Sequence, residues 1–505
     1  MPLFFDSGFF LSHDATDLIK KLQLLPDDGI EPAPYHLQEL KEAVKVIEKL
    51  RARIECSSPH RHAWLQGTHT LANGSAEQSG HQCSPFLAPT FEEPKFAPAI
   101  DLQAEVREIF SVASRLDIKL LECLIRYAKE MNPFSGTEVA KALSGNITVT
   151  ELIERVEPAS HSYAALRKAL KKYQQLCAER GPKSMHSAKL QMGSHGSDVK
   201  RLQQRLSEEA FYTGQPSSIF DKSTREAVQS FQRSHQLNPD GVVGTQTLDR
   251  LNEPYVKKLE MVQYSLRALR HSQTRRYERF IRINIPEFVL EYHTDGETKE
   301  TYRIIVGKAV DAQATLRGKS SRINQTPTLV SAVKQVILNP RWYVPDRIRM
   351  ELNDNLKSDP NYLVRNGYVA MSKSYPWGAP RLFQRPGPKN PLGQVKFEFP
   401  NRYGVYLHDT PQRHLFGLAR RDFSHGCIRV DRALDFAQLL LVDDENPESA
   451  GIEEYLKKNR QFFITLRHPV PLIIEYIPVS ANEEEKPVFL GDPYGLLAGN
   501  RANRS

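Results

Sequence analysis

One stretch in the last fifth of the chain has the residue types for nucleophilic chemistry. It reads YGVYLHDTPQRHLFGLARRDFSHGCIRVDRALDF and contains His408 and, further along, Cys427. A cysteine attacks only as the thiolate, so its proton must be removed with help from a nearby base or positive dipole. His408 ends a strand-like run, GVYLH, and a neighbouring strand could bring its imidazole within hydrogen-bonding reach of the sulfur. The stretch predicts a cysteine nucleophile with a histidine base.

The residues around Cys427 indicate how such a site would be supported. Gly426 allows a sharp turn, which can aim the amides of Gly426 and Cys427 toward a developing oxyanion. The residues that follow predict a helix starting around Asp431, whose positive dipole end would favour a thiolate. Asp409 is adjacent to His408 on a strand, so the two side chains point opposite ways. We therefore expect a backbone carbonyl to orient the imidazole.

The elements that must position these residues are β-strands. Alternating apolar and polar residues, rich in β-branched and aromatic types, predict an antiparallel β-rich domain over about 275–480. The runs are FIRINIPEFVLEYH, TYRIIVGK, TPTLVSAVKQVILNP, QVKFEFP, GVYLHD, QFFITL and PLIIEYIPV. A partly helical stretch at about 340–393 is long for a loop and predicts a lid insertion over the sheet. Residues 481–505 are expected to form a C-terminal tail.

Residues 189–252 predict a small unit of three short amphipathic helices. Ser223 and Glu226 have the spacing of a capping box for the second helix, and Thr245 can cap the third. The apolar positions recur at helical spacing and are expected to be buried. They are Val199, Leu202, Leu206, Ala227, Val228, Phe231, Leu248 and Leu251.

Residues 1–180 predict a helical scaffold domain without a cluster of catalytic residue types. It is interrupted at about 57–94 by a stretch rich in Ser, Gly, His and Pro without periodicity, which predicts a disordered insertion. The histidines from His60 to His81 could bind metal adventitiously, but a solvated loop is the preferred interpretation. The expected fold class is α+β multidomain: a helical scaffold, a three-helix unit and a β-rich catalytic domain with a capping insertion.

Composition excludes several classes of protein. A hydrophobic content of 40% with 25% charged residues is typical of a globular chain, and 505 residues allow several domains. Five cysteines without a CxxC pair do not form a disulfide scaffold or a zinc ribbon. No stretch is apolar enough to span a bilayer, and the N-terminus lacks the basic region of a signal peptide. The net charge of +8 arises from scattered residues, and it suits an anionic partner such as a cell-wall polymer, nucleic acid or no particular partner equally well. On charge alone, nucleic acid is not an expected partner.

The three-helix unit resembles the peptidoglycan-binding domain 1 family. The matching patterns are G-x-x-G-x-x-V-x-x-L-Q-x-x-L from Gly193, F-D-x-x-T-x-x-A-V-x-x-F-Q from Phe220, and D-G-x-x-G-x-x-T-L from Asp240. The resemblance implies attachment to the cell wall. A three-helix packing unit that binds no ligand is the alternative.

The stretch around Cys427 resembles the catalytic core of the L,D-transpeptidase family (ErfK/YbiS/YcfS/YnhG type), whose pattern is H…[ST]-H-G-C-x-[NR]. Runs at 339–345, 359–368, 386–401 and 405–416 resemble the large YcbB-type branch, which carries a scaffold, a peptidoglycan-binding domain and a capped catalytic domain. The resemblance implies that Cys427 is acylated and His408 is its base. The residues it implies for substrate binding and the oxyanion are Tyr406, Ser424, His425, Gly426 and Arg429.

The resemblance further implies the reaction. A tetrapeptide stem would acylate the cysteine and release its terminal D-alanine, and the diaminopimelate amine of a second stem would resolve the thioester into a 3→3 cross-link. Peptidoglycan stem peptides are the expected partners, with other cell-wall synthases as candidates, and no cofactor or metal is expected. Such a substrate places the protein in the periplasm, although the sequence shows no export signal.

Three alternatives remain open. A zinc hydrolase could use ligands among His408, His414, His425 and Cys427, although no HExxH pair is present. A cysteine peptidase could use the same thiol and imidazole with water as acceptor, but papain-like and NlpC/P60-like enzymes place Cys before His. A wall-binding protein with an inactive enzyme domain is the third.

Overall fold

The computed structural model describes residues 4–5, 11–57, 102–179, 184–186, 189–308, 324–345, 348–349, 352, 359, 361–374, 378 and 380–497. The chain divides into two compact units, Met1–Pro158 and Ala159–Ser505. The scaffold predicted over 1–180 therefore overlaps both units. The insertion predicted at about 57–94, with its histidines, lies outside the described residues from position 58 onward.

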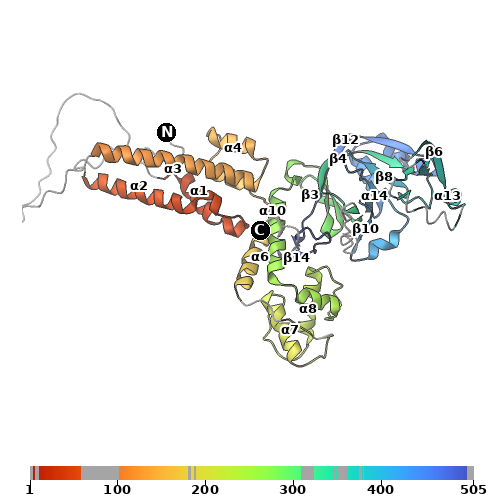
Figure 1. Cartoon of the computed structure of the whole chain (residues 1–505), viewed down its shortest axis with the longest axis horizontal. Coiled ribbons are helices and arrows are strands. Elements are labelled where there is room, and N and C mark those ends of the chain that lie inside the picture. The colour runs from red at the N-terminus through yellow and green to blue at the C-terminus, as the bar shows by residue number, and fades with distance from the viewer. Residues whose placement is uncertain are drawn as a thin grey trace, which may run out of the picture. The chain divides into compact units, whose positions relative to one another are not determined.

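The described part of the first unit is helical (Figure 1). Its helices are α1 (His13–Gln23), α2 (Leu37–Ser57), α3 (Leu102–Met131), α4 (Gly136–Leu143) and α5 (Val149–Val156). Two caps are encoded locally: Ser12 accepts a hydrogen bond from the amide of Ala15 at 3.1 Å, and Thr148 and Glu151 form a reciprocal capping box. The long helices α2 and α3 pack against each other along their apolar faces.

The second unit begins with further helices, and those at positions 197–251 confirm the predicted three-helix core. The helices are α6 (His161–Ala178), α7 (Ser197–Glu208), α8 (Lys222–Ser234), α9 (Thr245–Leu251) and α10 (Tyr255–Arg270). All the predicted core positions are buried except Leu248, which is partly buried against the same cluster. Helix α10 runs beside α6 (Figure 1).

Two predicted helix caps are wrong. Helix α8 is capped by Asp221, whose carboxylate accepts from the amide of Thr224 at 2.8 Å, so Ser223 already lies inside the first turn. Helix α9 is preceded by Gly244, which makes Thr245 its first helical residue. In both places the chain offers two candidate caps within two positions of each other, and the residue nearer the N-terminus is used.

A buried ionic cluster joins the three-helix unit to α6 and α10. The carboxylate of Glu209 pairs with Lys258 at 2.6 Å and with Arg205 at 2.8 Å, and it accepts from the hydroxyl of Tyr173 at 2.7 Å. Although burial opposes ionisation of Glu209, Lys258 and Arg205 hold its pKa down to about 2. The side chains of Glu209 and Lys258 are both fully buried, so each is the main compensation for the charge of the other.

The rest of the second unit is built on a nine-stranded sheet in the order β10-β3-β11-β9-β8-β4-β12-β1-β2. Its strands are β1 (Phe280–Asn284), β2 (Val289–Thr294), β3 (Glu297–Gly307), β4 (Leu329–Leu338), β8 (Val395–Glu398), β9 (Leu407–His408), β10 (Asp422–Ser424), β11 (Ile428–Val430) and β12 (Phe462–Glu475). Most pairs are antiparallel, as expected, but β1 with β12, β3 with β10 and β9 with β11 are parallel. An additional pairing of β2 with β3 closes the sheet on itself.

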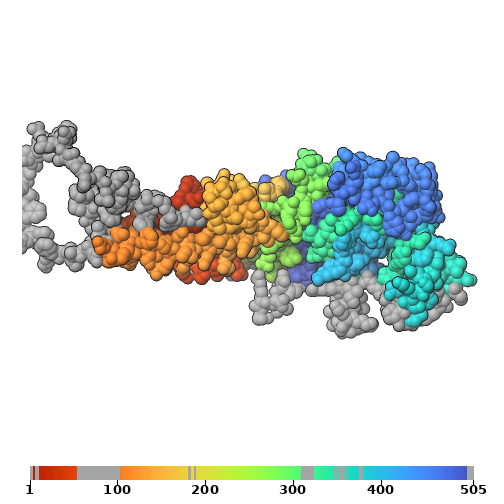
Figure 2. Space-filling view, turned by 90° about the horizontal axis from the view of Figure 1, so that it is seen from above, coloured from red at the N-terminus to blue at the C-terminus, as the bar shows by residue number. Residues whose placement is uncertain are grey.

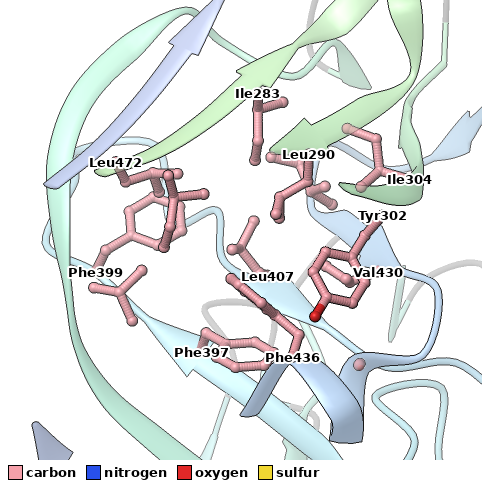
Figure 3. Packing of buried hydrophobic residues seen from close by; sticks show 14 of the residues in the cluster. Ile283, Leu290, Tyr302, Ile304, Phe397, Phe399, Leu407, Val430, Phe436 and Leu472 are labelled. Atoms are coloured by element: carbon pink, nitrogen blue, oxygen red, sulfur yellow. The ribbon is translucent and has the colours of Figure 1, made fainter. Parts of the chain in front are cut away.

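The closed sheet surrounds the main hydrophobic core, into which helix α14 (Ala433–Asp443) also packs. Figure 3 shows Phe436 of this helix beside Phe397 and Tyr302 of the strands, and the rings of Phe397 and Phe436 have centroids 5.0 Å apart. Inward residues from β9 and β11, such as Leu407 and Val430, are completely buried in the same cluster. Close packing on the core side of the sheet therefore holds the short strands that carry the candidate site.

The stretch at 340–393 forms a small sheet of its own. Strands β5 (Trp342–Tyr343), β6 (Tyr368–Ser374) and β7 (Pro380–Gln384) pair in the order β5-β7-β6, beside the short helix α13 (Tyr362–Arg365). In Figure 2 its described residues form a turquoise lobe on the surface of this unit. Tyr406 of the candidate site packs against its apolar cluster. Its role as a lid stays a prediction.

The C-terminal residues fold back onto the second unit. Helix α15 (Ile452–Lys457) precedes β12, and β13 (Val479–Ala481) pairs with β14 (Pro487–Phe489). Phe489 stacks on His235 of the three-helix unit, with ring centroids 5.2 Å apart, and meets Tyr173 of α6 edge-on at 5.5 Å. Tyr494 and Leu497 are buried as well. Much of the stretch predicted as a tail is thus packed structure.

Candidate active site

Two short parallel strands bring the predicted nucleophile beside the predicted base. In β9 and β11, Leu407 is paired with Ile428 and His408 with Arg429. Side chains alternate across a strand, and Leu407 and Ile428 point into the core. The opposite face therefore carries four of the predicted site residues: Tyr406, His408, Cys427 and Arg429.

The imidazole of His408 is oriented by a backbone carbonyl, which confirms that expectation. Its Nδ1 lies 2.5 Å from the carbonyl oxygen of Asp409. A carbonyl can only accept, so Nδ1 carries the hydrogen and Nε2 is the nitrogen that can take up a proton. The carboxylate of Asp409 is used elsewhere: it accepts from the amide of Gln394 and from Arg413, both at 2.9 Å. Asp409 thus fixes the base through its main chain.

The surroundings of His408 keep its ring neutral. Burial lowers the pKa of the imidazole to about 3, and the positive charges of Arg429 and Lys396 act in the same direction. The carbonyls of Asp409 and Pro391 oppose the shift but do not outweigh it. At neutral pH the imidazole is therefore uncharged, and one of its nitrogens carries no hydrogen.

Tyr406 connects the base to the sulfur. Its hydroxyl is hydrogen-bonded to Cys427 and accepts from the indole N–H of Trp342. Burial raises its pKa well above the ordinary value for a tyrosine, and Cys427 adds to the shift, so the hydroxyl stays protonated and donates to the sulfur. Its ring meets that of His408 edge-on, with centroids 5.7 Å apart, and Lys396 lies over the ring at 4.3 Å.

The Ser-His-Gly-Cys loop is held by its own hydrogen bonds. The hydroxyl of Ser424 donates to the carbonyl of Cys427 and accepts from the amide of Gly426 at 3.1 Å. Gly426 has φ of +115°, a conformation that favours glycine. The donors of Ser424 and Gly426, predicted to bind substrate or oxyanion, are thus committed within the loop. In this structure these two residues shape the turn that presents Cys427.

The helix predicted to start around Asp431 is present but begins two residues later, and it does not act on Cys427 as expected. Residues 428–430 form β11, and helix α14 begins only at Ala433, after Arg432 in a left-handed conformation. A strand therefore separates Cys427 from the helix, and the dipole effect falls off within a turn. A supporting hydrogen bond to the sulfur comes from Tyr406 instead.

Arg429 has one buried N–H donor without a hydrogen-bond partner among the described residues. Its Nη1 donates to the side-chain oxygen of Gln412 at 2.7 Å, but its buried Nε has no hydrogen-bond partner among the described residues. Burial lowers the pKa of the guanidinium, and the neighbouring Cys427 acts against that shift. A buried donor without a partner is rare in folded proteins and suits a ligand that brings an acceptor, such as a carboxylate.

All the predicted site residues line one cavity of about 1160 Å³. Three further residues line the same cavity and were not predicted from the sequence: Trp342, Thr326 and Tyr494. They come from the capping insertion, from the segment before β4, and from the C-terminal segment. Across the described residues, no group of three or more His, Cys, Asp or Glu side chains is placed to hold a metal ion. The zinc-hydrolase alternative therefore has no ligand set there.

Comparison with known families matches two parts of the second unit. Residues 278–448 match the YkuD family, described as the L,D-transpeptidase catalytic domain. Residues 195–251 match the family described as "Putative peptidoglycan binding domain". The first match contains the cavity residues from both paired strands, and the second coincides with the three-helix core.

Curated proteins give partial matches. A "Putative L,D-transpeptidase" of Haemophilus influenzae is 31% identical over 227 residues, which are 42% of this chain and 43% of that protein. An N-acetylmuramoyl-L-alanine amidase of Mycobacterium tuberculosis is 42% identical over 57 residues, 11% of this chain and 14% of that protein. The chain thus spans less than half the length of either relative.

Among solved structures, an L,D-transpeptidase from Xylanimonas cellulosilytica is similar with 18% identity and a TM-score of 0.18, covering 58% of this chain and 100% of that chain. From the family matches, the second unit of this chain carries a catalytic domain of the L,D-transpeptidase (YkuD) family, preceded by a domain of the peptidoglycan-binding domain 1 family.

Proposed function

We propose that this protein is an L,D-transpeptidase that forms 3→3 cross-links between peptidoglycan stem peptides through a thioester on Cys427. One observation carries the proposal: the parallel pairing of β9 and β11 puts His408, Tyr406 and Cys427 on one face of a cavity large enough for a peptide. The family match of this domain supports peptidoglycan as its substrate. The neighbouring three-helix unit would hold the enzyme on the wall.

In the acylation step, the sulfur of Cys427 attacks the carbonyl carbon before the terminal D-alanine of a tetrapeptide stem. Nε2 of His408 takes the thiol proton as the sulfur–carbon bond forms, because the ring is neutral at rest. The carbon–nitrogen bond then breaks, and the imidazolium returns the proton to the leaving D-alanine amine. The Tyr406 hydroxyl stabilises negative charge on the sulfur during the transfer.

In the second step, the side-chain amine of a diaminopimelate residue in another stem attacks the thioester carbonyl. His408 accepts a proton from this amine and delivers it to the departing sulfur, which restores the thiol. Arg429 would bind a peptide carboxylate through its partnerless Nε and so position one of the stems. With water as the acceptor the same site would act as a carboxypeptidase or endopeptidase, which is the second candidate function.

The substrate places this activity outside the cytoplasm, in the periplasm. Within the described residues, no helix is long and apolar enough to cross a membrane. Other wall synthases remain candidate partners.

The decisive assay incubates the protein with purified tetrapeptide muropeptides and identifies the products by mass spectrometry. Cross-linked dimers and an equal amount of released D-alanine are expected from the wild type and from Cys177→Ala, a matched variant at a half-buried thiol on α6. Cys427→Ala should give neither product. Released D-alanine without dimers would favour the hydrolase, and dimers from Cys427→Ala would refute the proposal.

A further inference from the structure

The carbonyl of the Gly426–Cys427 peptide is held by a residue far away in the sequence. The hydroxyl of Thr326 donates to the carbonyl oxygen of Gly426 at 2.9 Å across 100 positions, and the same hydroxyl accepts from the amide of Gly307 at 2.9 Å. Thr326 is buried, with 3% of its surface exposed. Its side chain therefore ties the end of β3 to the loop that precedes the nucleophile.

Holding that carbonyl also fixes the amide of Cys427. A peptide unit is planar and trans, so its C=O and N–H point in opposite directions within one plane. Because the C=O of Gly426 points at the buried Thr326, the N–H of Cys427 points away from it. A hydrogen bond to the carbonyl also polarises the peptide unit and makes its N–H a stronger donor.

The C-terminal segment holds Thr326 in turn. The hydroxyl of Tyr494 accepts from the amide of Thr326 at 3.1 Å and donates to the carbonyl of Gly307 at 2.9 Å. One hydroxyl thus contacts both Thr326 and Gly307, one of the two residues that Thr326 links. The approach is close: a Cβ on Gly307 would lie 1.9 Å from the carbonyl oxygen of Asn324, so only glycine fits there.

Tyr494 is itself firmly placed. Its amide donates to the hydroxyl of Tyr476 at 3.0 Å, and the two rings stack with centroids 5.8 Å apart. Asp492 accepts from the Tyr476 hydroxyl and from the amides of Leu496 and Leu497, both at 3.0 Å, which closes the segment into a turn. This turn lies beyond residues 278–448, which match the catalytic family.

We infer that Thr326 and Tyr494 are positioning residues that set the Cys427 amide as a donor to the oxyanion formed when Cys427 is acylated. The inference rests on the proposed function, since it concerns the acyl transfer to that sulfur. An oxyanion develops when the thiol adds to a carbonyl, and a donor fixed in advance stabilises it. Alkylation of the same thiol by displacement at a saturated carbon develops no oxyanion, so it does not need this donor.

A variant that loses only this donor should therefore slow acylation and leave alkylation unchanged, whereas a general structural defect should slow both reactions. Two rate constants are measured at Cys427 by peptide-resolved mass spectrometry: acylation by a carbapenem and alkylation by iodoacetamide. Thr326→Val keeps the shape but loses the hydroxyl, and Tyr494→Phe loses only the hydroxyl that holds Thr326. We expect Thr326→Val to lower the acylation rate by about tenfold or more and Tyr494→Phe by less, with alkylation of both within about twofold of wild type. Thr326→Ser keeps the hydroxyl and should restore acylation.

The outcomes separate the inference from the proposed function. Equal losses in acylation and alkylation, or no loss in either, would overturn the inference while leaving Cys427 as the acylated residue. A wild-type protein that is alkylated but never acylated at Cys427 would overturn the proposed function and this inference together. If Thr326→Val fails to fold, as judged by its melting temperature, Tyr494→Phe and Thr326→Ser decide the same question.

Discussion

The low pKa of the buried His408 imidazole should make the stability of the protein depend on pH. The ring is almost fully buried and its pKa is about 3, against an ordinary value near 6.5. Between these two values the unfolded chain binds a proton at this residue that the folded protein does not. The contribution of His408 to the free energy of unfolding is therefore fully present above pH 6.5 and is lost as the pH falls toward 3. Each pH unit is worth about 1.4 kcal/mol, so the loss is about 2 kcal/mol at pH 5 and about 3 kcal/mol at pH 4.

The variant that tests this pH dependence is His408→Gln, which keeps a polar side chain but cannot titrate. Urea unfolding of the wild type and the variant is followed from pH 7.5 to pH 4, and the difference in free energy of unfolding is taken at each pH. Other titrating groups are common to both proteins and cancel in that difference. The advantage of the wild type over the variant should shrink by about 2 kcal/mol between pH 7.5 and pH 5.

The same pKa can be read directly from the imidazole resonances in an NMR titration, assigned by their loss in His408→Gln. We expect the His408 signals to show a neutral ring with hydrogen on Nδ1 down to about pH 4. A stability difference that is independent of pH, together with a titration midpoint near 6.5, would show that the pKa of His408 is not lowered. It would mean that water reaches the ring or that Arg429 and Lys396 do not act on it.

Three other variants test the supporting structure. Gly393→Ala would place a Cβ 2.2 Å from the carboxylate of Asp409, whose carbonyl holds the base, so acylation should fall at least tenfold and the melting temperature should drop. Tyr406→Phe removes the hydroxyl bonded to the nucleophilic sulfur and should slow acylation about fivefold, with normal melting. Glu209→Gln leaves buried cations unpaired and should cost about 3–5 kcal/mol in urea unfolding, whereas the exposed Glu226→Gln should change stability by less than about 0.5 kcal/mol.

Much of the fold could be predicted because its signals are local. The alternation of apolar residues marked the strands, and helical spacing marked the three-helix core. The carbonyl that orients His408 could be expected from strand geometry alone, because Asp409 must point away from its neighbour. Helix ends were less certain, since Asp221 and Ser223 are both acceptable caps and only the three-dimensional start of α8 decides between them.

The parts of the site that were missed depend on contacts between distant segments. Thr326 acts on Gly426 from 100 positions away, and Tyr494 reaches Gly307 across 187 positions. Neither residue stands in a motif, and a tyrosine near the end of the chain gives no local sign of its partner. The helix expected around Asp431 begins two residues later, at Ala433. Pairing with β3 and β9 holds residues 428–430 in a strand, and no local signal showed that this strand separates Cys427 from the helix.

In the proposed reaction, the sulfur of Cys427 carries the acyl group. The most direct measurement is the intact mass of the protein after exposure to a carbapenem, followed by mapping of the modified peptide. We expect one added carbapenem per chain, located on Cys427, absent from Cys427→Ala and formed much more slowly in His408→Gln. An unchanged mass for the wild type, or an adduct that persists in Cys427→Ala, would contradict it.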